Sequence, residues 1–169
     1  MRAILADPAY DFRPALTSDL PMLRRWLETP EVARWWGDPA HQEDLLREDM
    51  AGTAMTMLIV SHDDRPFAFA QHCDVHDWPE PLYHHLPPET RAIDAMIGEP
   101  DMLGQGHGAK FLRALADNMT RDGAKLIVID PAVGNHRARR AYGRAGFEGN
   151  ARFRTREGTA VIMRFSGRR

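Results

Sequence analysis

Apolar positions along the chain follow two different periods. Side chains three and four positions apart share one face of a helix, and this spacing, together with capping residues, predicts helices at 20–27, 30–36, 41–50, 111–119 and 135–146. Alternating or short β-branched runs predict strands at 10–13, 55–60, 67–71, 91–97, 125–130 and 159–165. Helices and strands mixed along one chain indicate an α/β fold.

Proline, glycine and small polar residues mark the boundaries of these elements. Residues 17–19, Thr-Ser-Asp, are expected to cap the first helix, and Asp63–Pro66 are expected to form a hairpin turn. Residues 74–89 are rich in proline, histidine and aromatic side chains without any period, which predicts a long loop that is functional or mobile. No repeat or linker divides the chain, so we expect a single domain over residues 1–169.

Composition narrows the classes of function. The chain has 169 residues, 27% of them charged, and a net charge of −2, unlike the concentrated basic charge of nucleic-acid-binding proteins. Its one cysteine, Cys73, excludes an internal disulfide and is expected to be a buried apolar residue rather than a nucleophile. No Cys/His cluster has zinc spacing, residues 1–8 do not resemble a signal peptide, and no apolar run approaches the roughly 18 residues of a membrane span. We expect no metal, no nucleic acid, no membrane partner and a cytoplasmic location.

The stretch Leu103–Ala109, LGQGHGA, has a glycine at every second position between the strand at 91–97 and the next helix. Glycines 104, 106 and 108 lack the Cβ atoms that would keep a ligand away from the backbone. The first-turn amides of a helix and the positive end of its dipole then favour a phosphate group. The stretch predicts a phosphate-binding turn, with an ordinary tight turn as the alternative.

A second block, Asn135–Phe147, follows after one further strand. Tyr142 lies two helical turns after Asn135, so the two side chains share a face. In this order, the motifs between Phe12 and Arg164 resemble the GCN5-related N-acetyltransferase (GNAT) superfamily. The resemblance implies a central, mostly antiparallel mixed sheet with a splayed parallel strand pair and flanking helices, and acetyl-CoA as co-substrate. The residues that would contact acetyl-CoA are Met102, Leu103, Gly104, Gln105, Gly106, His107, Gly108, Ala109, Asn135, Ala138 and Tyr142. Leu103 departs from the family's usual Arg or Gln.

Acetyl transfer to an amine requires particular proton transfers. An amine with a pKa near 10 must lose a proton before it attacks, and a carboxylate or a water held by one can receive it. A tyrosine can protonate the departing thiolate, and Tyr142 is the candidate by its place in the matched block. Core packing of Tyr142 is the alternative. Backbone amides at the end of the Asp94–Ile97 stretch would polarise the thioester carbonyl.

Acidic residues indicate the charge of the acceptor. Asp94 lies inside an apolar strand, where a carboxylate needs a cation, hydrogen bonds or open solvent, and Asp130 ends the next strand. The alternatives are a salt bridge to Arg91 for Asp94, a cap on the turn at 131–134 for Asp130, and simple solvation for Asp77. Several carboxylates that converge on the acetyl group would suit a polycationic amine.

A narrower resemblance is to aminoglycoside 6′-N-acetyltransferases. The matching motifs, in order, are Trp35–Gly37, Pro66–Gln71, Arg91–Asp94, Leu103–Gly108, Asp130-Pro131 followed by Asn135, and Glu157-Gly158. The resemblance implies an acceptor pocket lined by Trp35, Trp36, Gln71, Asp77, Trp78, Asp94, Asp130 and Glu157, with Asp77 as the catalytic base. Glu157 stands where that family tends to have Asp. Core packing is the alternative for the tryptophans, more for Trp35 than for Trp36.

Two competing functions stay open. Acyltransferases of hydroxamate-siderophore biosynthesis share the Arg-x-Ile-Asp strand, the glycine loop and the Asp-Pro…Asn block. Their N-hydroxylysine-type acceptor carries a carboxylate, so their pocket needs a cation. The histidines of the loop are compatible with that requirement. A non-catalytic acyl-CoA-binding domain of the same fold is the third reading, because function depends on the site rather than the fold. The expected partner is a small-molecule amine, and the protein is expected to be a monomer or a homodimer.

Overall fold

The computed structural model describes residues 9–78 and 81–167. Residues 1–8, judged above not to resemble a signal peptide, and residues 79–80 of the long loop lie outside the described part. In chain order the helices and strands are β1 (Asp11–Pro14), α1 (Leu20–Leu27), α2 (Pro30–Trp36), α3 (Pro39–Ala51), β2 (Met55–His62), β3 (Arg65–Asp74), β4 (Thr90–Ile97), α4 (His107–Arg121), β5 (Leu126–Ile129), α5 (His136–Ala145), β6 (Phe147–Thr155) and β7 (Gly158–Phe165). Short 3₁₀ turns cover Thr17–Asp19, Pro81–Tyr83 and Pro100–Met102.

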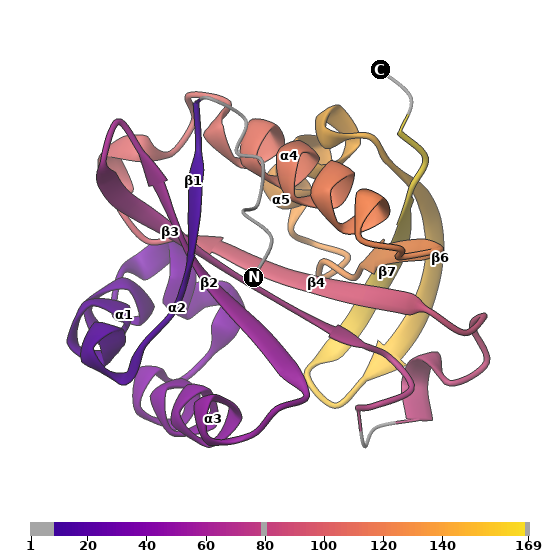
Figure 1. Ribbon diagram of the computed structural model, residues 1–169, viewed down its shortest axis with the longest axis horizontal. Coiled ribbons are helices and arrows are strands. Elements are labelled where there is room, and N and C mark those ends of the chain that lie inside the picture. The colour runs from indigo at the N-terminus through magenta and orange to yellow at the C-terminus, as the bar shows by residue number, and fades with distance from the viewer. Residues whose placement is uncertain (1–8, 79–80, 168–169) are drawn as a thin grey trace. The chain divides into compact units, whose positions relative to one another are not determined.

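The strands join one mixed sheet in the order β1-β2-β3-β4-β5-β7-β6 (Figure 1). The β4 and β5 strands are parallel, whereas the pairs β1–β2, β5–β7 and β6–β7 are antiparallel. The β2–β3 hairpin turns at Asp63 and Asp64, whose positive φ angles of 48° and 61° suit the right-handed twist of the flanking strands. The expected mixed α/β fold with a parallel pair in a mostly antiparallel sheet is confirmed.

By its internal contacts the chain divides into two compact units. The first holds the residues up to His72 together with Ala95–Gln105, and the second holds Cys73–Asp94 and Gly106–Arg169. The strands β3 and β4 each contribute residues to both units. The single domain expected over residues 1–169 stays a prediction.

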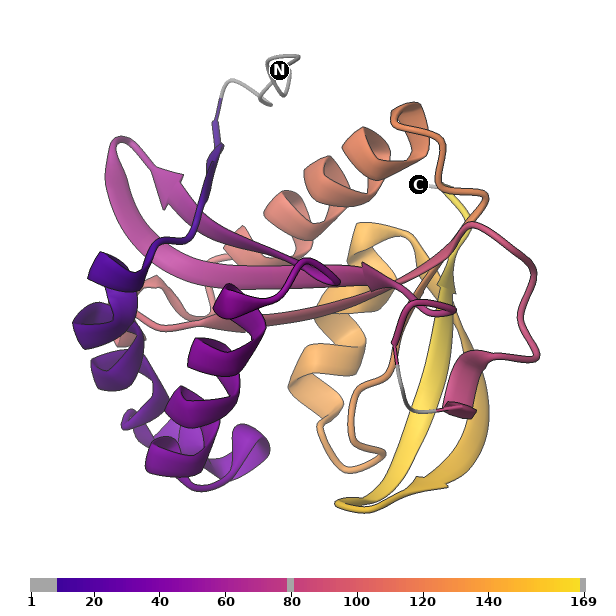
Figure 2. The ribbon, with the colours of Figure 1, turned by 60° about the horizontal axis from the view of Figure 1, so that its bottom comes forward.

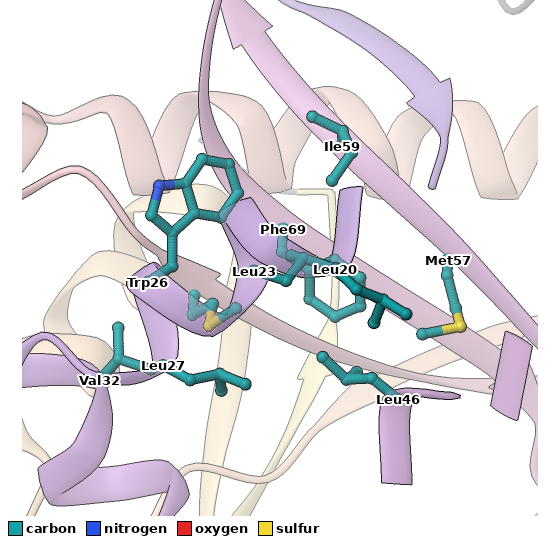
Figure 3. Packing of buried hydrophobic residues seen from close by; sticks show 10 residues of the cluster. Leu20, Leu23, Trp26, Leu27, Val32, Leu46, Met57, Ile59 and Phe69 are labelled. Carbon is teal, nitrogen blue, oxygen red and sulfur yellow. The ribbon is translucent and has the colours of Figure 1, made fainter. Parts of the chain in front are cut away.

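The core of the first unit lies between helices α1–α3 and the strands β2 and β3 (Figure 3). Its buried members are Leu20, Leu23, Trp26, Leu27, Val32, Leu46, Met57, Ile59, Phe69 and Met96. The indole Nε1–H of Trp26 donates to Glu99 Oε1 at 2.9 Å. Gly98, just after β4, lies so close to Trp26 that a Cβ there would be 2.0 Å from the indole Cγ. The buried residues of α1 are those whose helical spacing predicted its buried face, Leu20, Leu23, Trp26 and Leu27.

The second unit contains α4, α5 and the curved β6–β7 hairpin (Figure 2). Helix α4 buries Phe111, Leu112, Leu115 and Met119 on one face, as its spacing predicts, and it contacts α5. Gly146 ends α5 in the left-handed conformation with a φ of 103°, again as expected. Cys73 is buried and forms no disulfide.

One expectation about the elements was wrong, and one strand was missed. Thr17–Asp19 form a 3₁₀ turn and give α1 no side-chain cap, because the Asp19 carboxylate instead pairs with Arg13 at 2.7 Å and accepts from the Leu16 amide at 2.8 Å. Strand β6 was not predicted at all, because most of its side chains are exposed and it has no continuous buried face. Among the described residues, no helix is long and apolar enough to cross a membrane.

Candidate active site

The parallel pairing of β4 with β5 ends immediately before two aspartates. Ile93 opposite Ile129 is the final pair in the register. The next residues are Asp94, which continues β4 and is exposed, and Asp130, which is partly buried and precedes Pro131. Ligands of open α/β sheets bind beyond the carboxyl ends of parallel strands. The two carboxylates therefore lie where a ligand is expected, and Asp94 is exposed in an otherwise apolar strand.

The carboxyl group of Asp130 has a higher pKa than an ordinary aspartate. Burial raises the pKa of its carboxyl group to about 6, and the negative charge of Glu157 acts in the same direction. The Tyr83 hydroxyl and the backbone N–H of Asp130 itself oppose the shift. Because this pKa is close to neutral, Asp130 can both accept and release a proton near physiological pH.

Tyr142 lies on α5 with its ring tilted against Phe147 at a centroid distance of 6.4 Å. Burial, and then the negative charges of Asp94 and Asp130, raise the pKa of its hydroxyl well above the ordinary value. The phenol therefore stays protonated at neutral pH, as a proton donor must. The ring contact also fits the packing alternative, so packing and proton donation are compatible roles for this residue.

Sequence reasoning missed Tyr83, which lies in the 3₁₀ turn of the long loop. Its ring meets Phe153 of β6 edge-on at a centroid distance of 5.9 Å, and its hydroxyl oxygen is buried without a hydrogen-bond partner among the described residues. Burial and the charges of Asp130 and Asp94 strongly raise the pKa of the Tyr83 hydroxyl. The only sequence signal was a tyrosine within a loop predicted to be functional or mobile, and Phe153, which its ring contacts, lies on the unpredicted strand.

The glycine turn has the backbone that a phosphate-binding turn requires. Gly104 and Gly106 have left-handed φ angles of 73° and 84°, and Gly106 is the N-cap of α4. No side chain caps α4. The first amides of any helix have no carbonyl acceptor earlier in the same helix. At the head of the turn, the Gln105 side chain donates to the Asp101 carbonyl, and Met102 is buried. The second unit thus presents an uncapped helix N-terminus that suits an anion.

Asn135 already has a structural role. Its Oδ1 accepts a hydrogen bond from the Ala138 amide at 3.1 Å, which caps α5. The side-chain Nδ2 group can still donate to a ligand. This hydrogen bond brings the two candidates Asn135 and Ala138 together at the start of α5.

The remaining acidic candidates lie on turns. Glu157 is exposed between β6 and β7, close enough to Asp130 for its charge to raise that pKa. Asp77 is exposed after β3, and its amide donates to the Asp74 carbonyl at 3.1 Å. Trp78 is half-buried and its carbonyl accepts from His84 Nε2 at 2.9 Å. The second unit thus gathers Asp94, Asp130, Glu157, Tyr83 and Tyr142 within electrostatic range, whereas Asp77 stays a predicted base.

The candidates in the first unit are Trp35, Trp36 and Gln71. Trp35 is 36% exposed and stacks under the Arg34 guanidinium at 4.9 Å, whereas Trp36 packs edge-on against Phe69 at 6.3 Å. Core packing therefore applies to Trp36 rather than Trp35, the reverse of the expectation, because Trp36 follows the buried Val32 by one helical turn. The Gln71 Oε1 atom is buried without a hydrogen-bond partner among the described residues, so a ligand donor would satisfy it.

Comparison with known proteins gives one family match. The model described as an acetyltransferase (GNAT) domain matches residues 15–155. The aminoglycoside N(6′)-acetyltransferase type 1 of Klebsiella pneumoniae is 32% identical over 157 residues, which cover 86% of this chain and 77% of that protein.

Solved structures agree with the sequence match. The structure of AAC(6′)-Ib with paromomycin and acetyl-CoA has a TM-score of 0.84 and 29% identity, and the match covers 93% of each chain. The structure of the same aminoglycoside acetyltransferase with coenzyme A and kanamycin has a TM-score of 0.83 and 30% identity, covering 92% of this chain and 94% of that one.

Proposed function

The chain belongs to the acetyltransferase (GNAT) domain family, and we propose that it transfers the acetyl group of acetyl-CoA to an amino group of an aminoglycoside. The observation that carries the proposal is the group of carboxylates near the point where the pairing of β4 with β5 ends. Asp94, Asp130 and Glu157 present negative charge at that point. Charge-assisted hydrogen bonds to ammonium groups are the interactions that such a group of carboxylates offers best.

The residues present fit acetyl-CoA. The left-handed glycines and the uncapped N-terminus of α4 suit a pyrophosphate, with backbone amides of residues 104–109 as the donors. The Met102 and Leu103 amides already donate to the Glu99 and Pro100 carbonyls, so these two residues would contact the ligand by other atoms. Asn135, Ala138 and Tyr142 would contribute from α5. The absence of a positive side chain at Leu103 leaves this backbone contact intact. Acetyl-CoA supplies the activated acetyl group.

Residues of this chain would carry out the two proton transfers of the reaction. Tyr142, which is protonated at neutral pH, would donate to the departing thiolate sulfur. A carboxylate would take the proton of the acceptor ammonium, and Asp77 is the candidate that the family resemblance gives. In the second unit, Trp78 and the carboxylates would bind the acceptor. Trp35, Trp36 and Gln71 of the first unit stay candidates that the family resemblance gives. The cytoplasmic location and the monomeric or dimeric state stay predictions.

A thiol-release assay with acetyl-CoA tests the proposed function. The acceptor panel pairs an aminoglycoside that has a 6′-amine with its counterpart that has a 6′-hydroxyl, and adds a linear polyamine and N-hydroxylysine. We expect thiol release only with the 6′-amine. Turnover of N-hydroxylysine without any aminoglycoside would establish the siderophore-type reading instead, and binding of acetyl-CoA without turnover of any acceptor would establish the non-catalytic one.

A further inference from the structure

Arg65, at the start of β3, binds two carboxylates of the segment that follows β4. Its Nη1 donates to Asp101 Oδ2 at 2.7 Å and its Nη2 donates to Asp101 Oδ1 at 2.9 Å, which is a bidentate pair. The same Nη2 also donates to Glu99 Oε2 at 3.3 Å. Isolated ion pairs on a protein surface contribute little to stability, but bidentate geometry and shared networks are the exceptions. This network therefore restricts the conformation of the segment that carries the two carboxylates.

Glu99 connects the network to the core of the first unit. Its Oε1 accepts from the indole Nε1–H of Trp26 at 2.9 Å, and Trp26 is a buried member of that core (Figure 3). The Gly98 and Glu99 amides both donate to the Phe67 carbonyl of β3, at 2.8 and 3.2 Å. The segment is thus attached at its start both by its backbone and by a side chain.

Residues 99–105, called the entry segment, lead into the glycine turn and belong to the first unit. The Met102 amide donates to the Glu99 carbonyl at 3.0 Å, which turns the chain inside the segment. The Gln105 side chain donates to the Asp101 carbonyl and closes the turn around the left-handed Gly104. Within the described part of the chain, the Gly104 and Gln105 amides have no backbone acceptor, so they can donate to a ligand.

Asp101 is the residue that links these contacts. Arg65 holds its carboxylate, and Gln105 holds its carbonyl oxygen. The hydrogen bond from Arg65 also lowers the pKa of Asp101, so the pair stays charged at neutral pH. A loop that is already held in its binding conformation loses less conformational freedom when the ligand arrives, and it binds more tightly for that reason.

This inference rests on the proposed acetyl-CoA site. We propose that Arg65 is a positioning residue for acetyl-CoA: through Asp101 it holds the entry segment in the conformation in which the Gly104 and Gln105 amides bind the pyrophosphate. Arg65 acts through Asp101 and does not touch the ligand.

The proposal and simple electrostatics make opposite predictions for Asp101. Removal of a negative charge by itself favours binding of an anion. Loss of the anchor for Arg65 should instead loosen the entry segment and weaken binding. We therefore expect Asp101→Ala to bind acetyl-CoA more weakly by about fivefold to thirtyfold, which is the effect of having to order about one backbone residue. Arg65→Gln should weaken binding to a similar extent.

Calorimetric titration with acetyl-CoA measures these affinities. The double variant Arg65→Gln/Asp101→Ala should lose no more affinity than either single variant, because the two side chains act as one unit. At saturating acetyl-CoA, kcat should stay near the wild-type value, and the KM for the amine should not change. Purely additive losses would show that Arg65 and Asp101 act independently, and would overturn the proposal.

Arg24→Gln is the matched control. Arg24 belongs to the same unit and also binds two carboxylates, Glu28 at 2.7 Å and Glu43 at 2.9 Å. The control makes the same change in net charge as Arg65→Gln, and it should leave the affinity for acetyl-CoA unchanged. Equal losses in the two arginine variants would show a general effect of charge or stability and would remove the positioning role.

Two further outcomes separate this inference from its alternatives. If Asp101→Ala binds acetyl-CoA as tightly as the wild-type protein or more tightly, Arg65 does not act through Asp101, and the proposal fails. If the wild-type protein binds no acetyl-CoA, the proposed acetyl-CoA site fails, and this inference fails with it. If the wild-type protein acetylates an aminoglycoside while all three variants keep its affinity for acetyl-CoA, the proposed function stands and only the positioning role is lost.

Discussion

Asp94 shows how an apolar strand can carry a charged residue at little cost to the stability of the fold. A carboxylate in a strand between Ile93 and Ala95 would be expensive if buried, but its side chain is exposed where β5 has already ended. The same exposure makes its charge accessible to a cationic ligand. It also means that salt screens part of this attraction.

Replacement of Asp94 by Asn should weaken binding of the amine. Each charge-assisted hydrogen bond to an ammonium contributes about 1.5–3 kcal/mol, so KM for an aminoglycoside should rise about tenfold or more. The KM for acetyl-CoA should stay constant, and added salt should raise the wild-type KM for the amine more than that of the variant. Steady-state kinetics at two salt concentrations measure both effects.

Asp122→Asn removes an exposed carboxylate at the end of α4 and is the control for net charge. Equal effects of the two substitutions on KM would show that Asp94 acts only through the overall charge of the protein. That result would remove Asp94 from the acceptor site.

At the scale of elements, helix α4 is amphipathic along its length but has a glycine instead of a capping side chain at its N-terminus. Its buried face supplies much of the core of the second unit, whereas its first turn has no side-chain cap. Gly106 in the left-handed conformation directs the chain into the helix, and Gly108 lies inside the first turn. The core therefore uses one long face of the helix, whereas the proposed phosphate contact would use the backbone of its first turn.

Gly108→Val should abolish acetyl-CoA binding in a folded protein. The branched side chain would occupy the approach to the first-turn amides, and it adds no left-handed strain because Gly108 is helical. Calorimetric titration with acetyl-CoA measures the loss. The control Gly52→Val makes the same change at a position with a φ of −92° and ordinary Cβ contacts at 3.6 Å, and it should bind acetyl-CoA normally. Unchanged affinity in Gly108→Val would contradict the phosphate-binding turn.

The sequence was most informative where one local rule decides an element. The helical spacing of Leu20, Leu23 and Trp26 and the end of a helix at Gly146 depend on neighbours in the chain, and both predictions were correct. Strand β6 is held by its pairing with β7 at the edge of the sheet, so its exposed side chains carry no apolar signal. Tyr83 was missed for a different reason, since Phe153, which its ring contacts, is distant in the sequence.

Over the whole molecule, the raised pKa of Asp130 is a cost in stability. A carboxyl group whose pKa is higher in the folded than in the unfolded state binds protons more tightly when folded. The free energy of unfolding therefore falls as the pH rises from about 4 to about 6, and it stays lower above that range. A shift from 3.8 to about 6 corresponds to at most about 3 kcal/mol.

Asp130→Asn should therefore stabilise the protein at pH 8 and not at pH 4. We expect a gain of about 1–3 kcal/mol at the higher pH, accompanied by loss of acetyl transfer. Thermal unfolding of both proteins at the two pH values measures the difference. Equal melting temperatures at pH 8 would show that the folded protein carries the ionised carboxylate without cost.

The contact between Gly98 and Trp26 limits which variants of this protein can arise. Any side chain at position 98 would displace the indole that anchors the first core and donates to Glu99. At Gly143, on the surface of α5, a Cβ would meet nothing, so many residues fit there. Substitutions can therefore accumulate at the second position but not at the first, although both are single glycines.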